Sequence, residues 1–443
     1  MKKIFLFTLL LLFSIITFAE AKINLREYPA NRGQYYRIPR KERYSLLDSG
    51  KLFTWKKDDH DKGTYIPLKD IKDFEGKVID IKKYFDLYEL DLNGDGIKEV
   101  CVIPGNMPVY EEDEKTSDEW FGEAYYYRAT VLKKSGNGYK PFQVATIEGD
   151  YASVLDIRDL NGDGITDLLL SSGAGASSYN DIVEFFYFDK NSKTVKSQVF
   201  SQWVLLYDFN GDSIYELVVS FPEGCNSAHA YWASWQDIWE WNGKKYVLSC
   251  EKYPEYYDLV YIPQKIESMI DFGDMASAVT DRVPLIKKAW KIIIKAGLYE
   301  TIDAKAAGLE NKKGLAALDK GDREEALKHF KKAVTLFPQD PEFMNNLGFT
   351  YEDSRKYEKA IDCYLNTLAR DPARSVAWYN MACSKAVTGK KDQAVMCFYN
   401  YMRFAPPSAK AGDAVKYLAK NARSDKVREA AKEALKNYRK DDQ

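Results

Sequence analysis

The sequence lacks several features that would assign it to a particular class of protein. Its 443 residues carry 64 Lys and Arg against 66 Asp and Glu, a net charge of −2 at pH 7. Proteins that bind nucleic acid through its phosphates need an excess of basic residues, so this balance argues against a nucleic-acid partner. Hydrophobic residues make up 45% of the chain and charged residues 29%, which is typical of a globular protein and not of a disordered chain or a membrane bundle.

Signatures of catalysis are also scarce. Only three histidines are present, His60, His229 and His329, and their spacing matches no metal-ligand pattern. The chain contains no GxSxG nucleophile motif, no Walker phosphate-binding loop and no dinucleotide fingerprint. We therefore expect a protein that is not an enzyme, although the acidic pair of a hydrolase would leave no such signature.

The first residues are expected to form a targeting segment and not part of the fold. Lys2 and Lys3 precede an apolar run from Ile4 to Phe18, and Ala19-Glu20-Ala21 fits the cleavage site of a secretory signal peptide. The run is shorter than the ~20 residues that a membrane-spanning helix needs, so an uncleaved membrane anchor is the weaker alternative. We expect residues 1–21 to be removed and the mature protein, without a transmembrane span, to be periplasmic or secreted. No cysteine follows the run, which excludes the lipid anchor of a bacterial lipoprotein.

None of the six cysteines lies in a CxxC pair of the kind that binds zinc. Export to an oxidising compartment would allow disulfides to form. Cys225 and Cys250 bracket one aromatic segment and are the favoured pair, whereas Cys363, Cys383 and Cys397 are expected to be buried thiols in helices.

The chain changes character near residue 265. Before that point, short β-rich runs alternate with turn residues such as Asn242-Gly243, and the 32 tyrosines of the chain favour β structure. After it, Ala, Leu, Lys and Glu recur at helical spacing. We predict a β domain over residues 22–265, a linker with an amphipathic helix over 266–300, and a helical domain over 301–443.

One loop motif occurs three times in the β domain. Each copy has oxygen-bearing side chains at positions 1, 3, 5 and 9 and an isoleucine at position 7. The copies are Asp91, Asn93, Asp95, Ile97 and Glu99; Asp159, Asn161, Asp163, Ile165 and Asp167; and Asp208, Asn210, Asp212, Ile214 and Glu216. This spacing favours a loop curled around Ca²⁺, which takes six to eight oxygen ligands. The isoleucines would contribute main-chain carbonyls while their side chains point into the core.

Position 6 of the loop differs between the copies. Gly96 and Gly164 suit the positive φ of a sharp turn, whereas Ser213 does not, so the third site is expected to be weaker or empty. An EF-hand is excluded because position 12 holds Val102, Leu170 or Val219 instead of a glutamate.

The three loops, each followed by a strand, resemble those of the FG-GAP or VCBS repeat family. This resemblance implies calcium bound between two strands of each blade of a β-propeller. Residues 22–265 could supply four or five blades or an open stack of sheets. The alternative for the loops is a metal-free connection in which the Asp and Asn side chains bond their own backbone.

Three residue classes in the helical domain repeat every 34 residues: Ala326, Ala360 and Ala394; Phe330, Tyr364 and Phe398; and Pro338, Pro372 and Pro406. The pattern resembles the tetratricopeptide repeat (TPR), whose helix pairs need a small residue where they cross, an aromatic ring beside it and a proline after the second helix. The resemblance implies three repeats over residues 301–406 and capping helices over 407–443.

Arrays that resemble this one bind peptides in a concave groove formed by the first helix of each repeat. Mapped onto this sequence, the groove would present Asn311, Asn345, Asn346, Phe349, Tyr379, Asn380 and Cys383. Asparagine can both donate to and accept from a peptide backbone. We expect a protein or peptide partner here, with the alternative that the repeats pack on the β domain or on a second chain. His329, Cys363 and Cys397 share one register, but helices about 8–10 Å apart cannot bring them onto one ion.

A second partner surface is possible on the β domain. Trp232, Trp235, Trp239 and Trp241 could form a platform for a carbohydrate, although alternation along the strand favours core packing for at least half of them. The sequence thus predicts a multidomain α and β protein with a β-propeller-like antiparallel domain followed by an α-helical TPR solenoid. The predicted function is that of an exported, calcium-stabilised binding or scaffold protein, and the alternative is an adhesin-like or carbohydrate-binding surface protein.

Overall fold

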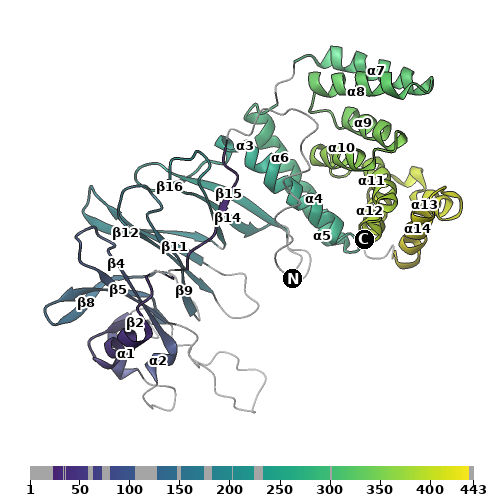
Figure 1. The fold of residues 1–443 in the computed structure, drawn as a ribbon. Coiled ribbons are helices and arrows are strands. Elements are labelled where there is room, and N and C mark those ends of the chain that lie inside the picture. Colours follow the sequence, from purple (N-terminus) through teal and green to yellow (C-terminus); the bar gives the residue numbers. More distant parts are fainter. Residues whose placement is uncertain are drawn as a thin grey trace. The chain divides into compact units, whose positions relative to one another are not determined.

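The computed structural model describes residues 23–32, 34, 36–57, 63–71, 80–104, 127–146, 151–173, 182–201, 203–223, 233–299 and 302–438. Contacts divide the chain into two compact units. The β unit comprises Asn24–Phe221 with Gln236–Ser249, and the helical unit comprises Pro222–Trp235 with the chain from Cys250 onward. In Figure 1 the β unit runs from purple to teal and the helical unit mainly from teal to yellow.

The described residues of the β unit form four antiparallel sheets. Their strands, in spatial order, are β4 (Phe85–Leu90), β5 (Glu99–Pro104), β7 (Thr130–Ser135) and β8 (Gly138–Val144); β12 (Thr194–Ser201), β11 (Ile182–Asp189), β10 (Asp167–Gly173) and β9 (Tyr151–Arg158); β1 (Glu27–Tyr28), β13 (Val204–Tyr207), β14 (Glu216–Pro222), β15 (Ser234–Trp241) and β16 (Tyr246–Leu248); and β3 (Gly63–Pro67), β2 (Phe53–Lys57) and β6 (Tyr127–Arg128). The short helices α1 (Arg40–Asp48), η2 (Leu68–Asp70) and α2 (Ile81–Tyr84) accompany them. None of the described sheets closes into a barrel, and a closed propeller stays a prediction.

The β10 strand shows how these sheets share their cores. Leu168 and Leu170 pack into the core between the β9–β12 and β4–β8 sheets, while Leu169 packs into the core on the opposite face. Side chains alternate across a strand, so an unbroken apolar run is stable only where both faces are covered. The Leu168–Leu170 run therefore places the β9–β12 sheet between two others, in a stack of sheets.

The three predicted loops connect the hairpins β4–β5, β9–β10 and β13–β14, and they too are stacked. The side chain of Ile165 in the second loop lies over Gly94 of the first, and Ile214 in the third lies over Gly162 of the second. The backbone N–H of Tyr215 also donates to the carbonyl of Leu160 at 2.8 Å. Ile165 and Ile214 therefore each pack on the preceding loop.

One prediction about these isoleucines is wrong. Ile97 does not point into the core, because its side chain is 50% exposed. The reason is its place in the series: the first loop has no preceding loop among the described residues on which its isoleucine could pack.

Gly162 and Gly211 provide a test of this stacking. Both have a left-handed backbone, with φ of +73° and +76°, but a Cβ at Gly162 would lie 2.6 Å from Cγ1 of Ile214, whereas nothing lies within 4 Å of one at Gly211. Alanine at either position should cost about 1–2 kcal/mol of stability from the backbone alone. We expect Gly162→Ala to cost about 1–3 kcal/mol more than Gly211→Ala because it also displaces Ile214. Urea unfolding measures both, and equal losses would contradict the stacking.

The helical unit begins earlier than predicted. Its helices are α3 (Pro254–Tyr256), the π-helical η5 (Tyr257–Tyr261), α4 (Ile262–Asp271), α5 (Ala276–Thr280), α6 (Arg282–Lys295), α7 (Ala304–Asp319), α8 (Arg323–Leu336), α9 (Pro341–Asp353), α10 (Tyr357–Arg370), α11 (Ser375–Val387), α12 (Lys391–Phe404), α13 (Ala411–Asn421) and α14 (Asp425–Asn437), with 3-10 turns η4 (Cys250–Lys252) and η6 (Pro407–Ala409). The last strand ends at Leu248, so the expected boundary at residue 265 lies inside a helix. None of the helices within the described ranges is both long and apolar enough to span a membrane.

Helices α7 to α12 form three antiparallel pairs, followed by the pair α13 and α14 (Figure 1). A Cβ at Gly348 of α9 would lie 2.8 Å from the ring of Tyr364 of α10, and one at Gly314 of α7 would lie 2.7 Å from Phe330 of α8. A glycine of the first helix therefore meets an aromatic ring of the second helix in these two pairs. The small residues predicted from the sequence, Ala326, Ala360 and Ala394, are fully buried on the second helices.

The second helices of the pairs have intramolecular partners. Helix α4 packs on α10 and α12, and α6 packs on α10. The amide of Asn400 in α12 donates to the carbonyl of Met269 in α4 at 2.7 Å, and the guanidinium of Arg370 in α10 lies 4.8 Å from the ring centre of Trp290 in α6. The α4–α6 segment is therefore an integral part of the helical unit and not a linker.

Candidate functional site

Exposed apolar side chains in helices α7 to α14 lie only on the first helix of each pair. They are Leu309 and Leu315 on α7, Phe349 on α9, Val376 on α11 and Tyr417 on α13. No large apolar side chain on α8, α10, α12 or α14, all of which the structure describes, is exposed to a comparable degree. Of these residues the sequence predicted only Phe349. Leu315 could have been found, because it lies 34 residues before Phe349.

The asparagines predicted to bind a peptide lie on the same helices but differ in exposure. Asn311 and Asn345 are buried in the free chain, so neither presents an exposed amide, and their role in binding a peptide stays a prediction. The amide of Asn346 on α9 donates to Oδ1 of Asn311 on α7 at 3.0 Å and so joins the two helices. Oδ1 of Asn345 is buried and has no donor among the described residues. Asn380 is half-buried.

Tyr379 and Cys383, the remaining predicted residues, are also half-buried. The ring centre of Tyr379 lies 5.0 Å from that of Tyr401 on α12, and burial raises the pKa of its hydroxyl to about 12. Burial likewise raises the pKa of the Cys383 thiol, which makes it a poor nucleophile. Both residues act as packing groups beside the exposed apolar stripe, which consists of Leu315, Phe349 and Val376.

The three acidic loops share one hydrogen-bond pattern. The first aspartate accepts the N–H of position 6 through Oδ2: Asp91 from Gly96 at 2.8 Å, Asp159 from Gly164 at 2.8 Å and Asp208 from Ser213 at 3.2 Å. The carboxylate at position 5 accepts the N–H of the isoleucine at position 7 in each loop. Ser213 has φ of +65°, close to the +77° of Gly96, so the third loop keeps the conformation without a glycine.

The carboxylates at position 9 are buried at the base of these loops. Glu99, Asp167 and Glu216 each accept the N–H of position 2, at 2.8–2.9 Å. Burial raises the pKa of Glu99 to about 6 and that of Asp167 well above its usual range, and the neighbouring loop carboxylates act in the same direction. The Lys133 ammonium is bonded to Asp95 and lies 3.9 Å from Glu99, so a side-chain cation already neutralises part of the charge of the first loop.

The donor set of the loops is made of oxygen, which suits Ca²⁺. The carboxylates, however, already have backbone N–H partners, as in the metal-free alternative. Across the described ranges, no group of three or more His, Cys, Asp or Glu side chains is arranged to hold a metal ion. Calcium binding stays a prediction.

The tryptophan platform does not form as expected. Trp235 is 1% exposed and stacks on Tyr257 of η5 with ring centres 5.3 Å apart, so it cannot contact a carbohydrate. Trp239 packs against Phe200, and Trp241 packs against Tyr187. Trp232, Cys225 and the predicted signal peptide lie outside the described residues.

Two protein-family models match the helical unit. One, described as TPR repeat, matches residues 314–354, and the other, described as tetratricopeptide repeat, matches residues 341–374. The helical part of this chain contains tetratricopeptide repeats. Such repeats form protein–protein interaction modules and are generally non-catalytic scaffolds.

Relatives of the chain match over this part. Protein bimA of Emericella nidulans is 32% identical over 88 residues, which are 20% of this chain and 11% of that protein. The Sgt2 TPR domain from Aspergillus fumigatus is 16% identical, with 31% of this chain and 82% of that chain covered and a TM-score of 0.25. MamA is 21% identical, with 36% and 87% covered and a TM-score of 0.25. The first TPR of Spaghetti (RPAP3), solved with the HSP90 peptide SRMEEVD, is 16% identical, with 30% and 98% covered and a TM-score of 0.26.

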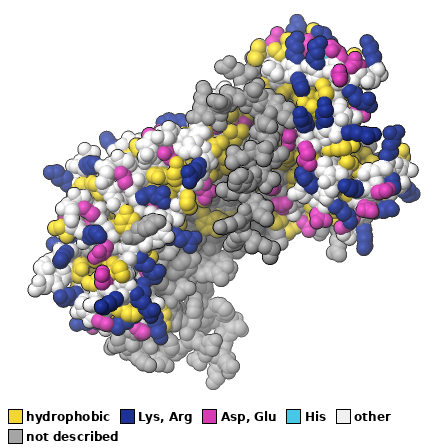
Figure 2. Space-filling view, in the orientation of Figure 1, with side chains coloured by type: hydrophobic (Ala, Val, Ile, Leu, Met, Phe, Trp, Pro, Cys, Tyr) yellow, Lys and Arg dark blue, Asp and Glu magenta, His cyan; other side chains and the backbone are white. Residues whose placement is uncertain are grey.

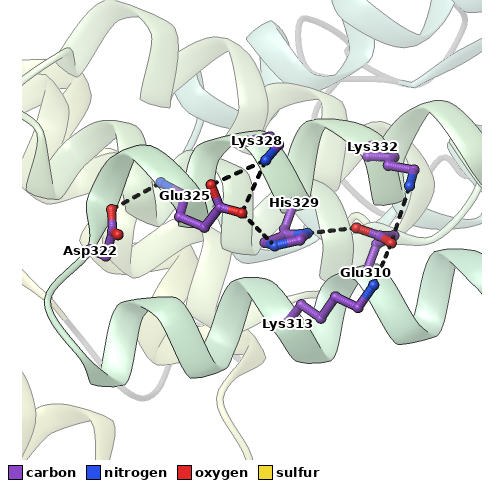
Figure 3. Close-up of polar contacts among 7 residues, drawn as sticks. All are labelled: Glu310, Lys313, Asp322, Glu325, Lys328, His329 and Lys332. Atoms are coloured by element: carbon purple, nitrogen blue, oxygen red, sulfur yellow. Dashed lines mark hydrogen bonds and ion pairs between the residues drawn. The ribbon is translucent and has the colours of Figure 1, made fainter.

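The first TPR contains a charged cluster that the sequence did not predict (Figure 3). His329 on α8 lies between two carboxylates, with Nδ1 2.6 Å from Glu310 Oε2 on α7 and Nε2 3.1 Å from Glu325 Oε1. Ionised carboxylates only accept hydrogen bonds, so the imidazole ring is the donor towards them. Lys313 and Lys332 also contact Glu310, at 3.0 and 3.2 Å.

The other two TPRs have apolar residues where the first TPR has this charged cluster. The positions of Glu310 and His329 are occupied by Met344 and Cys363 in the second TPR and by Trp378 and Cys397 in the third. These four residues are buried. The 34-residue register already aligned His329 with Cys363 and Cys397. Aligning Glu310 with Met344 and Trp378 in the same way would have predicted a charged pair in the first TPR.

The cluster predicts a specific dependence of stability on pH. The hydrogen bond from His329, followed by that from Lys313, lowers the pKa of Glu310 to about 2. A carboxyl group with a lowered folded-state pKa stabilises the fold above its unfolded pKa of about 4.5, and this contribution is lost as the pH falls towards 2. We expect Glu310→Gln to lower the urea midpoint at pH 6 and to have progressively less effect down to pH 3. Asp319→Asn, at the exposed end of α7, is the control; an equal effect of Glu310→Gln at both pH values would contradict the prediction.

Proposed function

We propose that this chain is a non-enzymatic adaptor whose first TPR helices bind a segment of a partner protein. The observation that carries the proposal is the one-sided exposure of apolar residues. Leu315, Phe349 and Val376 are exposed on α7, α9 and α11, whereas helices α4 and α6 pack on the second helices α10 and α12. A single exposed apolar residue is ordinary, but a series on consecutive helices of one face is typical of an interaction surface.

The charge distribution supports a protein partner over a polyanion. On the face drawn in Figure 2, Lys and Arg side chains are interspersed with Asp and Glu on both units. The whole chain carries a net charge of −2. Nucleic acid requires a continuous basic surface, which this distribution does not favour.

Two further parts of the proposal concern the β unit and the place of action. We propose that the acidic loops bind Ca²⁺ and that the stacked sheets are related to FG-GAP or VCBS repeats in a propeller-like arrangement. Three loops with equivalent hydrogen bonds and oxygen donors support this. Bound Ca²⁺ would supply positive charge between the loop carboxylates. The predicted signal peptide supports action in the periplasm or outside the cell.

The partner surface can be tested without knowing the partner. We expect the double variant Leu315→Ala and Phe349→Ala to lose proteins that crosslink to the exported wild-type chain, because each apolar side chain buried in a complex contributes about 1.5–3 kcal/mol. Ile294→Ala, which removes an exposed apolar side chain from α6, is the matched control. Quantitative crosslinking with mass spectrometry measures both. Capture that is equally strong with the double variant would contradict the proposal.

Calcium binding has a separate test. Asp163→Ala should remove about one bound Ca²⁺ and abolish part of the rise in melting temperature on adding calcium, because binding to the native state alone stabilises by about 2.7 kcal/mol at one hundred times Kd. Glu89→Gln removes an equal charge from β4 and should leave the metal content unchanged. Metal analysis and thermal melts with and without chelator measure the effect. Melting that is insensitive to chelator would refute a structural role for calcium.

A further inference from the structure

The exposed surfaces of α9 and α11 differ in charge from that of α7. Helix α9 has no Lys or Arg, and the single Lys of α11, Lys385, is buried and donates to Gln393 at 2.8 Å. Helix α7, by contrast, exposes Lys312 and Lys313. Helices α9 and α11 themselves therefore expose no Lys or Arg around Phe349 and Val376. Arg374, directly before α11, is half-buried, and Arg323 of α8 is paired with Asp353.

Acidic side chains are present on the same part of the surface. Glu342, in the first turn of α9, is exposed and has no ion-pair partner among the described residues. Asp353, at the end of the same helix, is paired with Arg323. Glu342 thus leaves one uncompensated negative charge beside the apolar stripe, and a basic residue of a partner would complement it.

The asparagine row adds a hydrogen-bond acceptor. Asn311 and Asn345 occupy equivalent positions in the first and second TPRs, and Oδ1 of Asn311 accepts from Asn346 of the next TPR. Oδ1 of Asn345 has no such donor and is buried, which is costly for a polar atom. A main-chain N–H from a bound segment would satisfy it.

We infer that the α9–α11 surface binds an extended, apolar peptide segment that carries a basic residue, and that it disfavours acidic segments. The apolar side chains would pack on Phe349 and Val376, the basic side chain would lie at Glu342, and a backbone N–H would donate to Asn345. This inference names the class of partner for the proposed function and rests on it.

The test uses two capped eight-residue peptides that alternate Leu or Phe with Ser and differ only in one Lys or one Glu. Fluorescence anisotropy with the full chain at low salt should show the Lys peptide binding about fivefold more tightly, a preference that falls as salt rises. Glu342→Lys should reverse the preference. Tighter binding of the Glu peptide, or a preference unchanged by Glu342→Lys, would overturn the inference.

Two further variants separate this inference from the proposed function. Phe349→Ser should abolish binding of both peptides; if it has no effect, the proposed binding face itself is wrong. Asn345→Leu should weaken binding about fivefold or more while leaving the urea midpoint unchanged or higher, because it removes an acceptor that has no partner in the free chain. Asn311→Leu is its matched control and should lower the midpoint because it breaks the bond to Asn346. Full binding by Asn345→Leu would overturn the role of that acceptor.

Discussion

The close approach of two helices within each TPR is the constraint on which the helical unit depends. Gly348 lets α9 meet the Tyr364 ring of α10, and Gly314 does the same for α7 and the Phe330 ring of α8. In the third TPR the equivalent small residue is Ala382, which is fully buried. Because the same contact recurs every 34 residues, each pair is oriented like the one before it, and the first helices come to share one face. The exposed stripe of Leu315, Phe349 and Val376 is a consequence of this repetition.

The β unit uses a related device in its loops. Gly94 and Gly162 lie directly beneath Ile165 and Ile214, so a residue without a side chain again permits the next unit to pack closely. The loop carboxylates hold the shape of each loop by accepting backbone N–H groups, and the buried position 9 carboxylate ties the loop to the start of the next strand. The chemistry that could hold calcium therefore also serves the metal-free fold, because the same carboxylates accept backbone N–H groups.

The sequence predicted local patterns well and their surroundings less well. The 34-residue register and the hairpin loops follow from residue spacing alone. The burial of Asn311 and the outward position of Ile97 depend instead on which repeat or loop lies next to them in space. The residue pattern within one repeat does not contain that information. The boundary near residue 250 was missed because tyrosine was taken as a sign of β structure. Tyr253, Tyr257 and Tyr261 recur every four residues, which is a helical period, and all three are buried in the helical unit.

The two faces of the TPR array have different roles: the second helices pack on α4 and α6, whereas the first helices are exposed. Exposed residues of the first helices can therefore contribute to binding without a loss of folding stability. Arg370, Trp290, Asn400 and Met269 join the second helices to the α4–α6 segment, so changes there would alter the fold. Phe349 is 47% exposed and contributes less to the core than a buried ring does. Because Phe349 contributes little to the stability of the unbound chain, its identity can be determined by what it contacts in a complex. The same reasoning applies to Glu342, whose charge has no structural partner among the described residues. Affinity and stability are thus assigned to different sets of residues on the same helices, and a variant at an exposed position such as Phe349 or Glu342 tests binding with little effect on the fold.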